Sequence, residues 1–442
     1  MNRLSLAFIL SALLPVAVLR GEELPEIFDL RNVGGLNYVT AVKSQSGGTC
    51  WTHGAMAAIE GNLMRTGMWL ASGETGEANL AEYHLDWWNG FNQHFNADIK
   101  PSSGGLTVHQ GGDYRVAAAY FARGGGAVRD ADGQSYSSPP KEKADGYHYF
   151  YVRDIEWFSA GRDLENIEKI KKAIHDGGVM GTALTWSGNF YNSSNKTFYQ
   201  PASSSSQPNH AVAIVGWDDT KKTQASNPGA WIAKNSWGSG WGQGGYFWIS
   251  YYDKITGQHP EMGAVSFQNT ERLKYSHIYF HDYHGWRDTK KDASEAFNRF
   301  TANGTPSGNE VPKAVSFYTA AENVEYTIRI FDRFEGGELA DPITVKEGVI
   351  GNVGLHTVDL NWPVTLKAGD DFYVYLKLSQ GGHPFDKTSN VPVLLGGSGR
   401  PIVESRANPG ESYFRSNGAW VDLTTFEKSA NFCMKALSVV EN

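Results

Sequence analysis

The spacing of apolar and polar residues along the chain changes character near residue 272. Before that point, apolar side chains recur at helical spacing over residues 50–65, and Gly67 supplies a stop signal. Similar patterns predict helices at 113–123 and 164–175. Apolar runs of strand length lie at 179–186, 211–217, 230–234 and 245–251. The first part of the chain therefore predicts a mixed unit of helices and strands.

Beyond residue 272, apolar and polar residues alternate with the period of a strand. The clearest runs are Val315/Phe317/Thr319, Tyr326/Ile328/Ile330 and Phe372/Val374/Leu376/Leu378. Helical patterns nearly vanish, and turn residues separate the runs, which is typical of a β-sandwich. We predict an α+β protein with a mixed unit at 27–270 and an all-β sandwich at 271–442.

The first residues carry the pattern of an export signal. Arg3 precedes an almost wholly apolar run at 4–19, and polar residues follow at 20–23. We expect residues 1–21 to be a signal peptide, and the protein to be secreted, periplasmic or at the cell surface. The apolar run lacks a clear cleavage motif, so a retained anchor is the less favoured alternative. No other apolar stretch is long enough to cross a bilayer, so we expect no integral membrane domain.

Length, composition and charge narrow the possible classes of function. A chain of 442 residues exceeds one average core, in agreement with two domains. Hydrophobic residues make up 40% and charged residues 19%, which is typical of folded proteins and argues against disorder. The net charge is −8 and no basic run occurs, so we expect no nucleic-acid partner.

The chain has two cysteines, too few for a disulfide framework. Cys50 begins the first predicted helix and follows Gln-Ser-Gly-Gly-Thr, whereas Cys433 lies near the far end in a strand-like stretch. The thiolate is the reactive form of cysteine, and a helix N-terminus lowers the thiol pKa. We expect Cys50 to be a nucleophile and Cys433 to be a small core residue. A disulfide between them is the alternative, and it would remove the nucleophile.

Residues far along the chain can supply the partners of such a thiol. His210 begins an apolar strand pattern, where it can hold the thiolate as an ion pair and later protonate a leaving amine. Asn235 can orient that imidazole through its side-chain carbonyl, and the Trp237 indole can shield the hydrogen bond from water. The Cys50 backbone N–H and the Gln45 side-chain amide are candidates for stabilising an oxyanion. Each of these residues taken alone also suits a structural role.

Five segments in order resemble the signature blocks of papain-family cysteine peptidases. They are Phe-Asp-Leu-Arg at 28–31, residues 45–59, Gly111-Gly112, residues 209–217 and residues 235–245. The resemblance implies a papain-like fold with a helical lobe, a β-barrel-like lobe and a cleft between them. It implies hydrolysis of protein or peptide substrates through a thioester, with no cofactor and no metal.

The resemblance also implies a role for each matching residue. Cys50 corresponds to the nucleophile, His210 to the acid and base, Asn235 to the residue that orients it, and Gln45 to the oxyanion donor. The expected substrate-binding residues are Gly111, Gly112, Ala211 and Trp237, with the strand at 179–186 beside the side-chain pocket.

The chain departs from the family pattern at several positions. The segment from Gln45 to Cys50 is one residue shorter than usual, and Thr49 stands where serine or alanine is commoner. His53 follows Cys50 by one helical turn, where an apolar residue is more usual. The block at 28–31 follows the leader almost at once, so we do not expect the usual long inhibitory pro-segment.

The C-terminal part resembles a lectin-like domain found behind bacterial papain-type peptidases. The similarity rests on residues 300–302, 314–319 and 326–330. It implies a bacterial exported enzyme whose C-terminal domain has a carbohydrate or another cell-surface ligand. A purely structural domain that packs on the peptidase is the equally weighted alternative.

Two other classes of function remain open on the sequence alone. A cell-wall amidase or an acyl transferase uses the same nucleophile, although it lacks the paired glycines and the Asn-Ser-Trp-Gly block. A catalytically silent surface adhesin is the second alternative, and the intact Cys50, His210 and Asn235 argue against it.

Overall fold

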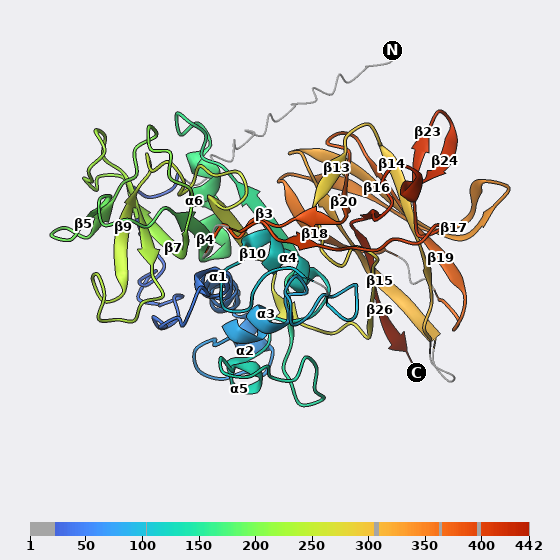
Figure 1. Cartoon of the computed structure of the whole chain (residues 1–442), viewed down its shortest axis with the longest axis horizontal. Helices are drawn as coiled ribbons and strands as arrows, with labels where there is room; N and C mark the ends of the chain where they lie inside the picture. The colour runs from blue at the N-terminus through green and yellow to red at the C-terminus, as the bar shows by residue number, and fades with distance from the viewer. Residues whose placement is uncertain (1–22, 103, 305–308, 362–364, 396–398, 442) are drawn as a thin grey trace, which may run out of the picture.

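The computed structural model describes residues 23–102, 104–304, 309–361, 365–395 and 399–441. Within these residues, all α-helices lie before residue 178, and the remainder is strand and loop apart from one 3-10 turn, Leu423–Thr425. Figure 1 shows the helices in the central and left part of the molecule and the C-terminal strands, coloured orange to red, in the right part. The predicted change from mixed to all-β structure is therefore confirmed.

Helix α1 (Cys50–Thr66) is the central helix of the mixed unit. It ends at Gly67, whose φ of +72° is a left-handed conformation that glycine adopts without strain. The predicted helix is confirmed, but its burial is wider than one apolar stripe, because every residue from Cys50 to Leu63 is buried. The helix lies against strands and other helices on several sides.

The two other predicted helices are confirmed as α4 (Tyr114–Ala122) and α6 (Ile167–Gly177). The Asp113 carboxylate caps α4 by accepting a hydrogen bond of 2.8 Å from the Val116 N–H. Leu164 has a φ of +61°, which no right-handed helix accommodates, so α6 begins only at Ile167. Three helices too short for a periodic signal were not predicted: α2 (Met68–Ala71), α3 (Glu82–Trp88) and α5 (Asp130–Gly133).

The strands of the mixed unit centre on β7 (His210–Asp218), which lies between β4 and β8. Ala211 pairs with Ala183 of β4, and Ala213 pairs with Lys234 of β8. The four predicted strands are confirmed as β4, β7, β8 and β9. The remaining bounds are β1 (Ile27–Asp29), β2 (Phe150–Tyr151), β3 (Asp154–Phe158), β4 (Met180–Leu184), β5 (Tyr191–Asn192), β6 (Thr197–Phe198), β8 (Ala230–Lys234), β9 (Tyr246–Ser250), β10 (Ala264–Gln268) and β11 (Glu271–Arg272).

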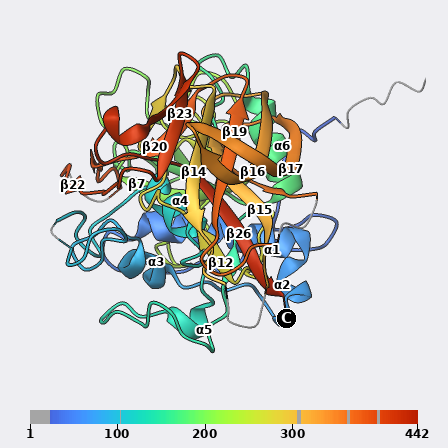
Figure 2. The same ribbon diagram turned by 90° about the vertical axis from the view of Figure 1, so that its right-hand side faces the viewer.

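The C-terminal unit is a sandwich of two antiparallel layers, as predicted. One layer has the order β17-β16-β19-β14-β23-β24, and the other contains β12-β26-β15-β18. Their apolar faces form one core that includes Phe317, Ile330 and Val374; Figure 2 shows both layers. The bounds are β12 (His277–Tyr279), β13 (Asp288–Lys290), β14 (Glu295–Thr301), β15 (Asn309–Thr319), β16 (Val324–Glu335), β17 (Glu338–Ile350), β18 (Gly354–Asp359), β19 (Asp371–Leu378), β20 (His383–Asp386), β21 (Ser389–Asn390), β22 (Ile402–Val403), β23 (Ser412–Ser416), β24 (Ala419–Asp422), β25 (Asn431–Phe432) and β26 (Met434–Glu441).

The two units share a sheet, which the sequence did not predict. Strand β18 of the sandwich pairs with β3 of the mixed unit, with Gly354 opposite Glu156 and Leu355 opposite Ile155. One layer of the sandwich therefore continues into the central sheet of the mixed unit. These backbone hydrogen bonds fix how the C-terminal unit sits beside the mixed unit.

The structure bears on the cysteines and on membrane segments. Cys50 and Cys433 are both free and buried, so the alternative of a disulfide between them is wrong. None of the helices in the described ranges has the length and apolar character that a bilayer crossing requires. The predicted signal peptide at 1–21 lies outside the described residues.

Candidate active site

Cys50 is the first residue of α1, and its side chain lies at the N-terminal end of that helix. Unpaired backbone N–H groups give this end a partial positive charge, which favours an anionic sulfur. The first turn contains no acidic residue to cancel the effect. The Thr49 hydroxyl donates to Ser46 O at 2.8 Å and so fixes the loop before the helix instead of capping it.

His210 and Asn235 meet across neighbouring strands. His210 begins β7, and Asn235 directly follows the last residue of β8. His210 Nε2 donates a hydrogen bond of 2.8 Å to Asn235 Oδ1. The Asn235 backbone N–H donates to Gly245 O at 2.9 Å, and Asn235 Oδ1 also accepts from the Ser236 N–H at 2.9 Å. Two donors thus hold the Asn235 side-chain oxygen, and Nδ1 is the ring nitrogen of His210 left for proton transfer.

Trp237 covers the imidazole of His210. The two rings stack with their centroids 4.5 Å apart and an interplanar angle of 23°. Trp186 packs edge-on against the Trp237 indole with ring centroids 4.8 Å apart, and Trp241 packs edge-on against the same indole at 5.2 Å. This aromatic wall holds the ring orientation of His210 and keeps water from the His210–Asn235 hydrogen bond.

Gln45 lies beside the same loop but is held by contacts within it. Its Nε2 donates to Gly47 O at 2.9 Å, and its Oε1 accepts from the Ser236 hydroxyl at 2.7 Å. Gln45 N also donates to Ser236 O at 2.8 Å. These bonds join the loop before Cys50 to the loop after Asn235. One Nε2 hydrogen of Gln45 is used by Gly47 O, and the second can donate to an oxyanion. The oxyanion role of Gln45 stays a prediction.

Gly111 and Gly112 lie next to α1 in a space that admits no side chain. A Cβ on Gly112 would lie 2.6 Å from the Trp51 ring, so only glycine lets the backbone approach the helix this closely. Gly111 has a φ of +107°. Ala211, the fourth predicted substrate-binding residue, is fully buried in β7 directly after His210.

A cluster of buried charges behind the site was not predicted. Lys43 Nζ lies 2.7 Å from Glu60 Oε1 and 2.5 Å from Glu82 Oε1, and both carboxylates are 1% exposed. Burial lowers the pKa of Lys43, but the two carboxylates hold it above its ordinary value. With His53 and Asn235, these residues line a cavity of about 20 Å³, which holds about one water. One sequence feature could have indicated this cluster: Glu60 is a charged residue inside an otherwise apolar helical run.

The neighbouring His53 is buried beside this cluster. Its Nδ1 donates to Thr49 O at 2.9 Å, and burial lowers its pKa. A neutral histidine bonded to its own helix cannot add a positive charge to the Cys50 thiol.

A segment of the C-terminal unit reaches Cys50. Cys50 Sγ lies 4.0 Å from the carbonyl oxygen of Leu395, and Leu395 forms an antiparallel β-bridge with Gly112. Sequence reasoning missed this contact, since no local pattern relates residues 345 positions apart.

Burial governs the protonation of both reacting groups in this arrangement. It raises the pKa of the Cys50 thiol to about 11, although hydrogen bonds from the backbone at Ala211 and Trp51 lower it. It lowers the pKa of His210 to about 4, although the hydrogen bond to Asn235 raises it. Among the described residues no hydrogen bond joins the thiol to His210. The neutral thiol and neutral imidazole are therefore favoured here, rather than the expected ion pair.

Comparison with known proteins identifies the two units. A model of the papain family of cysteine proteases matches residues 24–261, and a model of a lectin-like domain matches residues 278–438. Among curated proteins, cathepsin L2 of Homo sapiens is 29% identical over 52% of this chain and 61% of its own length. Pro-cathepsin H of Bos taurus is 30% identical over 51% of this chain and 59% of its own. The chain thus spans less than two thirds of these relatives.

Two solved structures share the whole architecture. One is the clostridial cysteine protease Cwp84 after propeptide cleavage, with a TM-score of 0.75, 21% identity and coverage of 93% of this chain and 99% of that one. The other contains the cysteine protease and lectin-like domains of Cwp84, a surface layer associated protein of Clostridium difficile. It has a TM-score of 0.73 and 21% identity, with coverage of 95% of this chain and 89% of that one. At this identity the likeness shows the fold alone.

Proposed function

The chain belongs to the papain family of cysteine proteases, and from this premise we propose that it hydrolyses peptide bonds with Cys50 as nucleophile, His210 as acid and base, and Asn235 as the residue that orients His210. The observation that carries the proposal is the 2.8 Å hydrogen bond from His210 Nε2 to Asn235 Oδ1, which leaves Nδ1 free for the thiol proton. The place of Cys50 at the start of α1 supports it further.

The reaction proceeds in two steps. His210 Nδ1 takes the thiol proton, and the sulfur attacks the carbonyl carbon to give a tetrahedral intermediate. Its oxyanion accepts hydrogen bonds from the Cys50 N–H and the Gln45 amide. When the intermediate collapses, the C–N bond breaks, the leaving amine takes the proton from His210, and a thioester remains on Cys50. Water then gives a proton to His210 and attacks the thioester, which releases the acid and restores the thiol.

The substrate binds as an extended strand across the site. Gly111 and Gly112 pair with its backbone, because their lack of side chains lets another chain lie directly over them. Ala211 and β4 line the pocket for one substrate side chain, and Trp237 borders the leaving-group side. The physiological substrate is a protein or peptide outside the cell, in accordance with the signal peptide proposed at residues 1–21.

The test is hydrolysis of casein by Cys50→Ala, with Cys433→Ala as the matched control. Both are buried free cysteines, so the two substitutions remove equal volumes. We expect Cys50→Ala to lose essentially all turnover while its unfolding temperature stays near that of the wild type. Cys433→Ala should keep wild-type turnover. Release of peptides from murein with no cleavage of casein would instead support a cell-wall amidase.

We propose a second function for the C-terminal unit, the binding of a carbohydrate at the cell surface. A groove of about 600 Å³ lies beside β14, where His281 stacks on Phe300 with ring centroids 4.8 Å apart. Arg299 borders the groove and pairs with Asp371 at 2.6 Å. The half-buried His281 ring, supported by the buried Phe300, and the polar groups beside it suit the apolar face and hydroxyls of a sugar ring.

Titration with purified surface polysaccharide tests this second function. Arg299→Ala should weaken binding, whereas Arg333→Ala, an equally exposed arginine that pairs with Asp341, should not. Equal binding by both variants would contradict a site in this groove.

A further inference from the structure

The substrate-binding face of the site is already covered by this chain itself. Residues 391–395, here named the blocking segment, come from the C-terminal unit, yet Val391 and Leu395 belong to the apolar core of the peptidase unit. Both are fully buried, and Val393 and Leu394 pack against the same core. The blocking segment is therefore inserted into the peptidase unit and does not merely rest on its surface.

The backbone of the blocking segment lies where a substrate strand would lie. Leu395 forms an antiparallel bridge with Gly112. A Cβ built on Gly111 would meet Leu395 O at 2.5 Å and Val393 Cγ1 at 2.8 Å. The segment therefore occupies the space above both glycines, the edge at which a peptide adds as a strand.

The blocking segment also reaches the nucleophile. Leu395 O is 4.0 Å from Cys50 Sγ, and Cys50 is only 2% exposed. An attacked carbonyl carbon must come within about 3–3.5 Å of the sulfur, so a substrate cannot reach Cys50 while Leu395 stays in place. The same cover removes water from the thiol, and burial raises the pKa of Cys50 to about 11.

A short hairpin holds the blocking segment in position. Strands β21 and β22 pair Ser389 with Val403 and Asn390 with Ile402. Beyond this pair, the Val391 N–H donates to Pro401 O at 2.9 Å. The hairpin ladder thus leads directly from the C-terminal unit into the cleft.

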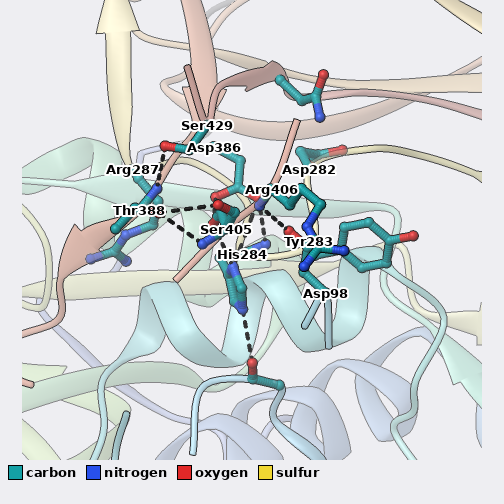
Figure 3. Close-up of polar contacts among 12 residues, drawn as sticks. Asp98, Asp282, Tyr283, His284, Arg287, Asp386, Thr388, Ser405, Arg406 and Ser429 are labelled. Carbon is teal, nitrogen blue, oxygen red and sulfur yellow. Dashed lines mark hydrogen bonds and ion pairs between the residues drawn. The ribbon is translucent and has the colours of Figure 1, made fainter. Parts of the chain in front are cut away.

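A buried polar cluster fastens the base of this hairpin to both units (Figure 3). The Ser405 hydroxyl lies 2.9 Å from Asp386 Oδ1 and 2.7 Å from His284 Nδ1. His284 Nε2 then donates to Gly90 O of the peptidase unit at 2.9 Å. Arg287 Nε donates to the Ser389 hydroxyl at 3.0 Å, at the start of the hairpin. Hydrogen bonds therefore anchor both strands of the hairpin, at Ser389 and at Ser405.

We propose that the blocking segment is a built-in inhibitor of the peptidase, which occupies the substrate-binding face as a strand and must leave before a substrate can bind. The proposal rests on the proposed peptidase function. Because the segment is tethered, its effective concentration at the cleft is on the order of millimolar, so weak contacts suffice to keep a dilute substrate out. Movement of the hairpin then opens the site to substrate.

The test displaces the blocking segment with two charges. Val393→Asp with Leu395→Asp places carboxylates in an apolar cleft, and Ile402→Asp is the matched control, since Ile402 lies on the same hairpin but is 58% exposed. The first readout is alkylation of Cys50 by iodoacetamide, located by peptide mapping, which requires access to the thiol but not peptidase activity. The second readout is hydrolysis of a fluorogenic peptide.

We expect the double variant to be alkylated at Cys50 at least about tenfold faster than the wild type and to hydrolyse the peptide correspondingly faster, while Ile402→Asp matches the wild type. Unchanged alkylation in a folded double variant would overturn the proposal. Faster alkylation without hydrolysis would support the blocking segment and count against the peptidase function. Cleavage of the wild-type chain within the segment would show a substrate and overturn the proposal. If the double variant fails to fold, Val393→Ala with Leu395→Ala gives the same readouts.

Discussion

His210 and Trp237 form a stacked pair with ring centroids 4.5 Å apart, and this pair fixes the geometry of the proposed site. The indole lies over the imidazole, while Asn235 holds the ring edge through Nε2. Trp237 therefore covers one face of the imidazole and Asn235 binds one edge. These protein contacts set the direction in which Nδ1 points. The predictions below follow from this arrangement and from the charges around it.

Asn235→Ala should lower kcat by about 10²-fold, because the imidazole loses its orienting acceptor but the nucleophile and base remain. This loss is smaller than that of Cys50→Ala. Asn235→Asp is the control, since it keeps an acceptor for His210 Nε2 and adds a charge that raises the His210 pKa. We expect it to keep more activity than Asn235→Ala and to shift the pH profile upward. Equal activity of both variants with unchanged pH profiles would contradict the orienting role.

Glu60→Ala should destabilise the fold by about 3–5 kcal/mol, because it removes a buried carboxylate that pairs with the half-buried Lys43 and accepts from the Leu80 N–H. The matched control is Glu322→Ala, which breaks the exposed pair of Lys169 and Glu322 and should cost about 0–1 kcal/mol. Urea unfolding of both variants measures the difference. Equal losses would show that the buried cluster contributes no more than a surface pair.

Asp386 predicts a specific dependence of stability on pH. Burial raises its pKa to about 7, against an ordinary value of 3.8, although hydrogen bonds from His284 and Ser405 lower it. The folded state thus keeps a proton that the unfolded state has released, so this contribution to stability is present below pH 3.8 and is lost as the pH rises to about 7.

Asp386→Asn should remove this dependence. The stability of the variant relative to the wild type should rise between pH 5 and pH 8 by up to about 3 kcal/mol, because each unit of pKa is worth about 1.4 kcal/mol. Urea unfolding of both proteins at pH 5 and at pH 8 measures this difference in stability. A constant difference between the proteins would show that Asp386 does not titrate in this range.

Local patterns predicted the elements on which the site is built. The apolar run after Cys50 gave α1, and the runs after His210 and before Asn235 gave β7 and β8. These elements are long or strongly apolar, so their periodicity is readable. Short helices such as α3 (Glu82–Trp88) carry no such signal.

Contacts between distant segments could not be predicted in this way. The pairing of β18 with β3 and the approach of Leu395 to Cys50 depend on how the two units pack, which no local spacing encodes. The protonation state of Cys50 also depends on such a contact between distant segments. The helix N-terminus favours the thiolate, but the burial imposed by the blocking segment outweighs it.

Labelling of the thiol tests the central claim most directly. A thiol-directed epoxide is added to the wild type, to the Val393→Asp, Leu395→Asp variant, and to each of these carrying His210→Ala, and the adducts are located by mass spectrometry. The claim predicts one adduct, on Cys50. It should form fastest in the Val393→Asp, Leu395→Asp variant and should be lost with His210→Ala. Equal labelling with and without His210, or an adduct on Cys433 in the folded protein, would contradict it.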